Sequence, residues 1–389
     1  MIVNGAIFAV LRNFGTLALF CCLPGGILSQ TGNTAAVEPE PAFADSSPHR
    51  VQMVTVEKDV RLEVLDWGGT GRPVVLLAGS GNTAHIYDDF APRLAEKYRV
   101  YGVTRRGSGA SSAPSSGYSA RRLGDDVLAV LEALKLDKPV LVGHSFAGQE
   151  VSSIATRFPG RIGGAVYLDA AYGYAFYAPS VGELSFDLPE LQKKLEQFNQ
   201  SQGDAKLIDE LLQTELPAME KDLARKKQFN DLISQVPPGQ GHPAAADMAS
   251  FTKLRAWYAL NMVGGNPPEV ELHWSFESNP DGSVGKFRPH PAVSPEDAKW
   301  EKFTRFQIPV LAIYACPVDY GPLIDNNQAL RGKLEAYNST DCQARAKALE
   351  EDSPGSRAVL WPRVYHYLFI ARPEETLKEM RAFIDSLPQ

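Results

Sequence analysis

A serine surrounded by small residues is the first candidate for chemistry in this sequence. The stretch VLVGHSFAG, residues 140–148, runs from apolar residues into a turn that holds Ser145. The pattern G-x-S-x-G places a nucleophilic serine on a sharp strand-to-helix turn, and here Ala147 stands where the last glycine is usual, with Gly148 one residue later. Small neighbours let such a turn pack closely. The alternative interpretation is that Ser145 only caps the helix that follows.

A serine hydroxyl needs a general base to become a nucleophile at neutral pH. His366 follows the last predicted strand, in a loop expected at the carboxyl edge of the sheet, and we interpret it as that base. His144 is next to the serine, so its side chain should point to the opposite side of the turn. The remaining histidines lie in the N-terminal leader, at the start of the first helix or in the predicted insertion: His49, His85, His242, His273 and His290.

The base needs a carboxylate to orient it, and several aspartates follow strands in the required chain order of serine, aspartate, histidine. We predict Asp319, which follows the strand IPVLAIYACP two strands after the serine. Asp169, which ends the strand GAVYLD, is the alternative, with a structural role held by backbone donors as its other interpretation. Asp325 is a third and more distant candidate.

An oxyanion formed during acyl transfer needs backbone N–H donors. The expected donors are Phe146, directly after the nucleophile, and Ser80, at the start of the loop after the strand PVVLLAG. Gly79 and Gly81 make this loop flexible enough to approach a substrate. A phosphate cradle is disfavoured because the G-x-G-x-x-G and Lys-Ser/Thr patterns are absent.

Strand and helix patterns alternate along most of the chain, which predicts a mostly parallel sheet covered by helices on both faces. Strands are expected at 51–56, 61–67, 73–79, 99–105, 139–144, 163–171, 308–317 and 356–362. The first two of these strands suggest an antiparallel edge. Helices are expected at 85–98, 119–136, 146–158, 336–351 and 373–386.

The pattern changes between the two parts of the predicted sheet. Amphipathic helices separated by loops rich in proline and glycine are expected at 188–198, 205–216, 221–233 and 251–261. We therefore divide the chain into a core of residues 51–171 and 303–389 and a helical cap inserted at 172–302.

These motifs together resemble the α/β-hydrolase superfamily, in its lid-bearing branch of serine esterases, lipases and epoxide-hydrolase-like proteins. The segments that carry the resemblance are LLAGSGNTAHIYDDFAPRLA, VYGVTRRGSGASS, VLVGHSFAGQE and VYHYLFIARPEETLKEMRAFI, and the insertion falls where this family has its cap. The sequence departs from the family at Ala78, Ala147 and Tyr365. Because the strand-to-helix turn carries a serine at position 145 and not an aspartate, the resemblance implies ester- or acyl-type chemistry on a small-molecule substrate.

The N-terminus has the order of a secretory signal: an apolar start, Arg12, a short apolar run at 14–23 and small residues after it. We expect a signal peptide at 1–29, a flexible leader at 30–50 and a secreted or periplasmic protein without a stable membrane span; an uncleaved anchor is the alternative. Cys316 and Cys342 remain after cleavage, and they either pair or stay as buried thiols.

The net charge of −7 argues against a nucleic-acid partner, which would require a basic face. No H-E-x-x-H motif or paired-cysteine spacing is present, so no metal site and no cofactor are expected. The leading hypothesis is a serine hydrolase. The alternatives are a non-catalytic ligand-binding protein with this fold, and lyase, C–C hydrolase or perhydrolase chemistry on the same residues. Aromatic residues of the insertion are candidates for the pocket lining: Tyr172, Tyr174, Phe176, Tyr177, Trp257, Tyr258 and Trp274.

Overall fold

The computed structural model describes residues 45–201, 203–236, 243–261, 265–288, 301–324 and 327–388. The predicted signal peptide and most of the predicted leader, together with His242, His290 and Asp325, lie outside these residues. Among the described residues, no helix is long and apolar enough to cross a membrane.

The described chain contains an eight-stranded sheet with the order β1-β2-β4-β3-β5-β6-β9-β10. Its strands are β1 (Arg50–Glu57), β2 (Val60–Gly68), β3 (Pro73–Leu77), β4 (Arg99–Val103), β5 (Val140–His144), β6 (Gly164–Leu168), β9 (Val310–Ala315) and β10 (Ser356–Trp361). β2 pairs antiparallel with both β1 and β4, and the remaining neighbours pair parallel. The predicted α/β sheet with an antiparallel edge is thus confirmed.

Side chains alternate between the two faces of the sheet, and each face has its own apolar cluster. Val74 and Leu76 of β3 pack on one face with α2 (Ala91–Ala95) and α13 (Pro373–Ser386). On the other face, Val75 and Leu77 pack with α3 (Ala120–Ala133), α4 (Gly148–Arg157) and part of α11 (Gln328–Asp352). Because both faces are covered, the central strands are continuous apolar runs.

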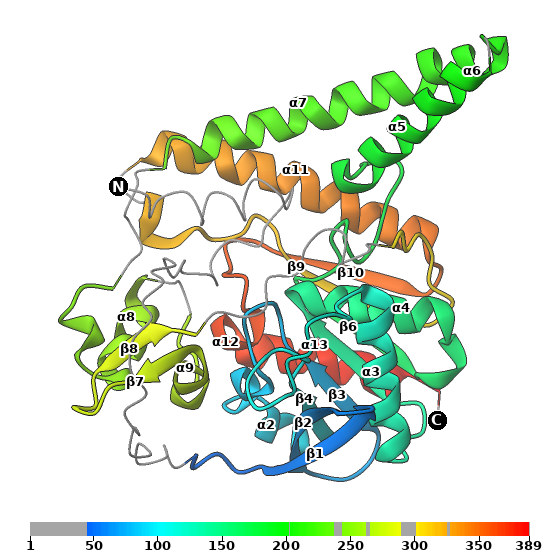
Figure 1. Ribbon diagram of the computed structural model, residues 1–389. Helices are drawn as coiled ribbons and strands as arrows, with labels where there is room; N and C mark the ends of the chain where they lie inside the picture. Colours follow the sequence, from blue (N-terminus) through cyan, green and yellow to red (C-terminus); the bar gives the residue numbers. More distant parts are fainter. Residues whose placement is uncertain are drawn as a thin grey trace.

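The described residues between β6 and β9 add no strand to this sheet. They contain α5 (Leu184–Gln200), α6 (Ala205–Glu210), a π-helical turn at Leu211–Glu215, α7 (Leu216–Ile233), α8 (Phe251–Asn261) and α9 (Glu269–Ser275). A small hairpin of β7 (Phe276–Ser278) and β8 (Val284–Phe287) was not predicted. Figure 1 shows α5, α6 and α7 extending along and beyond α11, while α8, α9 and the hairpin form a separate lobe beside the sheet.

The predicted bounds of two helices need correction: the helix between β3 and β4, and α11. The helix expected at 85–98 is a 3₁₀ turn, η1 (Ala84–Tyr87), followed by the short helix α2. Pro92 lies in the first turn of α2, where the fixed φ and missing N–H of proline fit a helix start. The helix expected at 336–351 begins earlier, at Gln328, because the Asn327 side chain caps it by accepting from the N–H of Leu330.

Candidate active site

Ser145 lies on the sharp turn between β5 and α4 that its sequence context predicts. Its φ is +50°, a left-handed conformation that non-glycine residues rarely adopt. The side chain is nearly buried, with 7% of the residue exposed. A strained backbone at a buried polar residue is typical of a functional position, and an ordinary helix cap would have extended backbone instead.

The close packing around this turn explains why small residues surround the serine. A Cβ added at Gly148 would overlap the carbonyl oxygen of Ala170, in the segment after β6. Ala147 is fully buried and its methyl group is accommodated. The position that needs glycine is therefore 148, and Ala147 is a tolerated small residue.

His366 is buried in the loop after β10, and its Nδ1 lies 2.6 Å from Oδ2 of Asp169. This carboxylate, and not that of Asp319, contacts the histidine. The prediction of Asp319 is therefore wrong as to which aspartate contacts His366, and the alternative that the sequence left open is the one that the geometry favours.

Asp169 is held in place from several sides at the carboxyl end of β6. It also has a positive φ, +47°, and no exposed surface. Its Oδ1 accepts the N–H of Ala315 at 3.0 Å and the hydroxyl of Tyr172 at 2.6 Å. Burial and the adjacent carboxylate raise the pKa of Tyr172 well above its usual value, so this hydroxyl stays protonated and donates. One carboxylate oxygen is thus occupied by donors, and the other faces the histidine.

Asp319 is close to the histidine loop along the backbone but its side chain turns elsewhere. Its N–H donates to the carbonyl of Val364 at 2.9 Å, two residues before the histidine. Its carboxylate instead accepts the N–H of Gly321 at 2.9 Å and faces Arg331 of α11 at 3.3 Å. Both contacts are made by Oδ1 of Asp319, and they direct this side chain toward its own turn and α11.

The loop after β3, which should supply an oxyanion donor, lies against the nucleophile. A Cβ added at Gly79 would be 3.1 Å from the Cβ of Ser145 and 2.9 Å from Nδ1 of His144. The glycine is therefore needed for this close approach. The role of the Ser80 and Phe146 N–H groups as oxyanion donors stays a prediction.

Arg105, which the sequence reading did not single out, controls the direction of that loop. Its guanidinium donates to the carbonyls of Ala78 at 2.8 Å and Gly79 at 3.2 Å, and it pairs with the buried Glu150 of α4. The N–H of Ser80 shares a peptide unit with the Gly79 carbonyl and points the opposite way in a trans peptide. By binding the carbonyl, Arg105 fixes the orientation of the predicted oxyanion donor. Arg105 lies in the segment VYGVTRRGSGASS, which carries the resemblance to the superfamily, but no pattern in that segment predicts its contacts with the two carbonyls.

Tyr174 is a second residue at the site to which the sequence gave no chemical role. The sequence predicts it only as a candidate for the pocket lining, but its hydroxyl hydrogen-bonds with the Ser145 side chain. Burial raises the pKa of Tyr174 above its usual value, although this hydrogen bond opposes the shift. The hydroxyl of Tyr174 therefore stays protonated and lies beside the Ser145 hydroxyl.

The side chain of His144 packs against the loop that carries His366. Its Nε2 lies 3.2 Å from the carbonyl oxygen of His366, and the two imidazole rings are 4.6 Å apart. Burial, aided by the nearby His366, lowers the pKa of His144 well below its usual value, so the ring is neutral. A neutral ring donating through Nε2 supports the backbone of the residue expected to act as base.

Comparison with known proteins agrees with this fold. Residues 72–333 match the family model described as alpha/beta hydrolase fold. Because this match covers more than half of the chain, the protein belongs to that family.

Particular relatives match over shorter stretches. A non-heme chloroperoxidase of Streptomyces lividans is 38% identical over 120 residues, which are 30% of this chain and 44% of the relative. The 2-(acetamidomethylene)succinate hydrolase of Mesorhizobium japonicum is 23% identical over 157 residues, 40% of this chain and 53% of the relative. The chain thus matches only about half of the length of these relatives.

A solved structure of E-2-(acetamidomethylene)succinate hydrolase superimposes with a TM-score of 0.52 and 16% sequence identity. The match covers 87% of this chain and 100% of the chain in that structure. At that identity the likeness concerns the fold alone.

Proposed function

We propose that this protein is a serine hydrolase that cleaves an ester- or acyl-type bond of a small-molecule substrate. The observation that carries the proposal is the pairing of His366 with Asp169 at 2.6 Å, at the same edge of the sheet where Ser145 is held with a φ of +50°. A nucleophile on a strained turn and a histidine oriented by a buried carboxylate are the parts that acyl transfer requires.

In this proposal Ser145 attacks the substrate carbonyl while His366 takes the hydroxyl proton through Nε2. Asp169 keeps the other ring nitrogen, Nδ1, protonated and stabilises the imidazolium that forms. The N–H groups of Ser80 and Phe146 stabilise the oxyanion. His366 then donates its proton to the leaving group, and water activated by the same ring cleaves the acyl-enzyme.

The relatives' names support this chemistry in outline, since they include a hydrolase and a chloroperoxidase of the same fold.

The proposal is tested by assaying the purified protein against p-nitrophenyl esters of short and long acyl chains, beside Ser145→Ala. We expect turnover of at least one ester and its loss in the variant. A folded wild-type protein that binds such compounds without turnover would instead support the ligand-binding alternative.

We also propose that the protein works in an oxidising compartment. Cys316, at the end of β9, and Cys342 of α11 form a disulfide with a Cα–Cα separation of 6.0 Å. Disulfides persist in exported proteins and are rare in the reducing cytosol, which supports the export expected from the N-terminal sequence. Fractionation of the producing cells, with detection of the protein outside the cytoplasm, tests this.

A further inference from the structure

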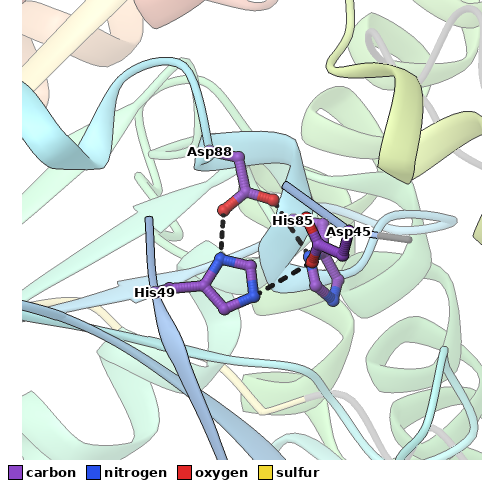
Figure 2. A group of neighbouring side chains, drawn as sticks. All are labelled: Asp45, His49, His85 and Asp88. Carbon is purple, nitrogen blue, oxygen red and sulfur yellow. Dashed lines mark hydrogen bonds and ion pairs between the residues drawn. The ribbon is translucent and has the colours of Figure 1, made fainter. Parts of the chain in front are cut away.

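Four side chains outside the proposed active site lie close together at η1, in the connection between β3 and β4. Asp45 and His49 come from the segment before β1, and His85 and Asp88 come from η1 and the residue after it. One ligand atom from each lies within 4.8 Å of those from the others. Figure 2 shows Asp88 joined by dashed lines to both imidazoles, and Asp45 beside His85 with a dashed line to His49.

We propose that these four residues form a binding site for one divalent transition-metal ion, with Zn²⁺ as the best fit. Two imidazoles and two carboxylates are a common N₂O₂ donor set for zinc. The two negative carboxylates balance the +2 charge of the ion.

The distances between the donor atoms fit a four-coordinate ion. Bonds of about 2.1 Å in a tetrahedron place neighbouring ligand atoms about 3.4 Å apart. Asp45 Oδ2 lies 3.5 Å from His85 Nδ1 and 3.1 Å from His49 Nε2. Asp88 Oδ2 lies 2.9 Å from His85 Nδ1, whereas Asp88 Oδ1 lies 2.9 Å from Nδ1 of His49, the ring nitrogen that does not contact Asp45. An ion held by Nε2 of His49, Nδ1 of His85 and one oxygen of each aspartate would therefore leave Nδ1 of His49 bonded to the second oxygen of Asp88.

The residues behind the donors resemble the outer shell of a metal site. Nδ1 of His85 faces the cluster, while its Nε2 lies 3.5 Å from the buried carboxylate of Glu63. Glu63 in turn accepts the hydroxyl of Thr104 at 2.7 Å. A ligating histidine usually donates its other N–H to such a carboxylate, which fixes the ring orientation. On the other side, the indole of Trp67 donates to Asp88 at 3.0 Å.

Burial distinguishes this cluster from an ordinary surface ion pair. The side chains of His49, His85 and Asp88 are 2–3% exposed, and only Asp45 is partly open, at 27%. Three donors are therefore held away from water, and Asp45 leaves a path by which an ion can enter.

A bound ion would link the segment before β1 to the loop after β3, which lies next to Ser145. His85 follows Thr83, whose hydroxyl accepts the His85 N–H at 3.2 Å, and Asn82 is bonded through its N–H to the Gly79 carbonyl at 3.3 Å. His85 also stacks on Trp274 of α9, with ring centroids 6.1 Å apart. The inference does not depend on the hydrolase proposal, because none of the four donors belongs to the Ser145–His366–Asp169 set.

The test is metal binding by the full protein after treatment with EDTA and its removal. Titration calorimetry with Zn²⁺ should give one ion per chain, and excess Zn²⁺ should raise the melting temperature by about 5 °C. Mg²⁺ and Ca²⁺, which prefer oxygen donors, should not reproduce the shift. Amide hydrogen exchange should slow at 45–49 and 84–88.

Matched variants locate the ion. Asp45→Asn alters the most exposed donor and is expected to weaken Zn²⁺ binding at least tenfold, and Asp45→Asn with His49→Gln should abolish it. His273→Gln, in α9 and outside the cluster, should bind like the wild type. Absence of stoichiometric Zn²⁺ binding by the folded wild type, or equal binding by the double variant, would overturn the proposal.

A spectroscopic measurement on the wild type serves if a variant does not fold. Co²⁺ in place of Zn²⁺ should give the intense visible absorption of a four-coordinate ion, and X-ray absorption of the Zn²⁺ form should show two imidazole ligands. A six-coordinate spectrum without imidazole scattering would contradict the site.

Discussion

At the scale of single residues, the identity of the orienting carboxylate decides how His366 is held. Asp169 contacts His366, whereas Asp319 is engaged by Gly321 and Arg331. Asp169→Asn should lower kcat by about 10³- to 10⁴-fold, because an amide no longer holds the histidine in the correct tautomer. Steady-state kinetics on the best ester of the panel measures this.

Asp319→Asn is the matched control, since it makes the same chemical change on the neighbouring aspartate. It should change kcat by less than about tenfold, because Asp319 touches no reacting group. The reverse order of effects would return the orienting role to Asp319.

Gly148 is the second residue-scale prediction. Gly148→Ala should destabilise the protein by about 1–3 kcal/mol, because the new methyl group overlaps the Ala170 carbonyl and the turn must shift. Ala147→Gly should cost less, since it removes a methyl group that already fits. Urea unfolding of both variants checks the order, and equal stability of Gly148→Ala and the wild type would show that the turn is not tightly packed.

These two cases show what the sequence can and cannot predict at this scale. The types of residue around Ser145 predict the turn, because only small side chains fit there. The choice between Asp169 and Asp319 depends on where each carboxylate points, and both follow strands in the same chain order. The Asp319 carboxylate instead contacts the N–H of Gly321 and the side chain of Arg331. No rule of residue spacing predicts these two contacts.

At the scale of elements, α9 contacts the loop after β3 through one buried carboxylate. Glu271, 2% exposed, accepts the side-chain amide of Asn82 at 2.9 Å and the N–H of Thr83 at 3.0 Å, and bonds the Thr83 hydroxyl as well. Asn82 is also bonded to the hydroxyl of Tyr367, next to the histidine, at 2.8 Å. The insertion is thus linked to both loops of the proposed site.

Burial raises the pKa of Glu271 to about 7, although bonds from Thr83 and Asn82 and the charge of His85 oppose the shift. In the unfolded chain its pKa is near 4.5, so the folded protein binds more protons between these values. Its contribution to stability is therefore full below about pH 4.5 and is lost as the pH rises through about 7. The loss amounts to at most about 3 kcal/mol.

Glu271→Gln should remove this dependence, because the amide stays neutral. The difference in unfolding free energy between the variant and the wild type should move in favour of the variant between pH 4.5 and 7.5, measured in EDTA so that metal binding does not contribute. A constant difference across this range would contradict a buried neutral carboxyl.

The elements themselves were predictable where their patterns were regular. Alternating apolar runs and amphipathic helices predicted the sheet and α13, whose bounds match the expected 373–386. The hairpin β7–β8 was missed because its strands have only three and four residues, too few for a periodic pattern. The link from Glu271 to Asn82 joins residues 189 positions apart, so no local pattern carries it.

At the scale of the whole molecule, the disulfide joins the end of β9 to α11, 26 residues further along the chain. Cys316→Ser with Cys342→Ser should lower the free energy of unfolding by about 3 kcal/mol, chiefly because the unfolded chain gains freedom when a loop of this length is opened. Thermal or urea unfolding of the double variant measures it. A double variant as stable as the wild type would mean that the cysteines do not pair.

The burial of His49 in the segment 45–49 also depends on the whole molecule, because residues from other parts of the chain pack against it. His49 was predicted to lie in a flexible leader, because its neighbours are proline, serine and alanine. Its ring is buried against Asp88 and packs edge-on to Trp67, with ring centroids 5.8 Å apart. Composition describes how a segment behaves alone, and here partners 18 to 39 residues away determine its place.

The central claim is that Ser145 is an activated nucleophile, and covalent trapping tests it most directly. The folded protein is treated with a fluorophosphonate and its mass and modified peptide are determined. The account predicts one adduct per chain, located on Ser145 and absent from Ser145→Ala and from His366→Ala. An unmodified wild-type protein, or an adduct that persists in Ser145→Ala, would contradict it.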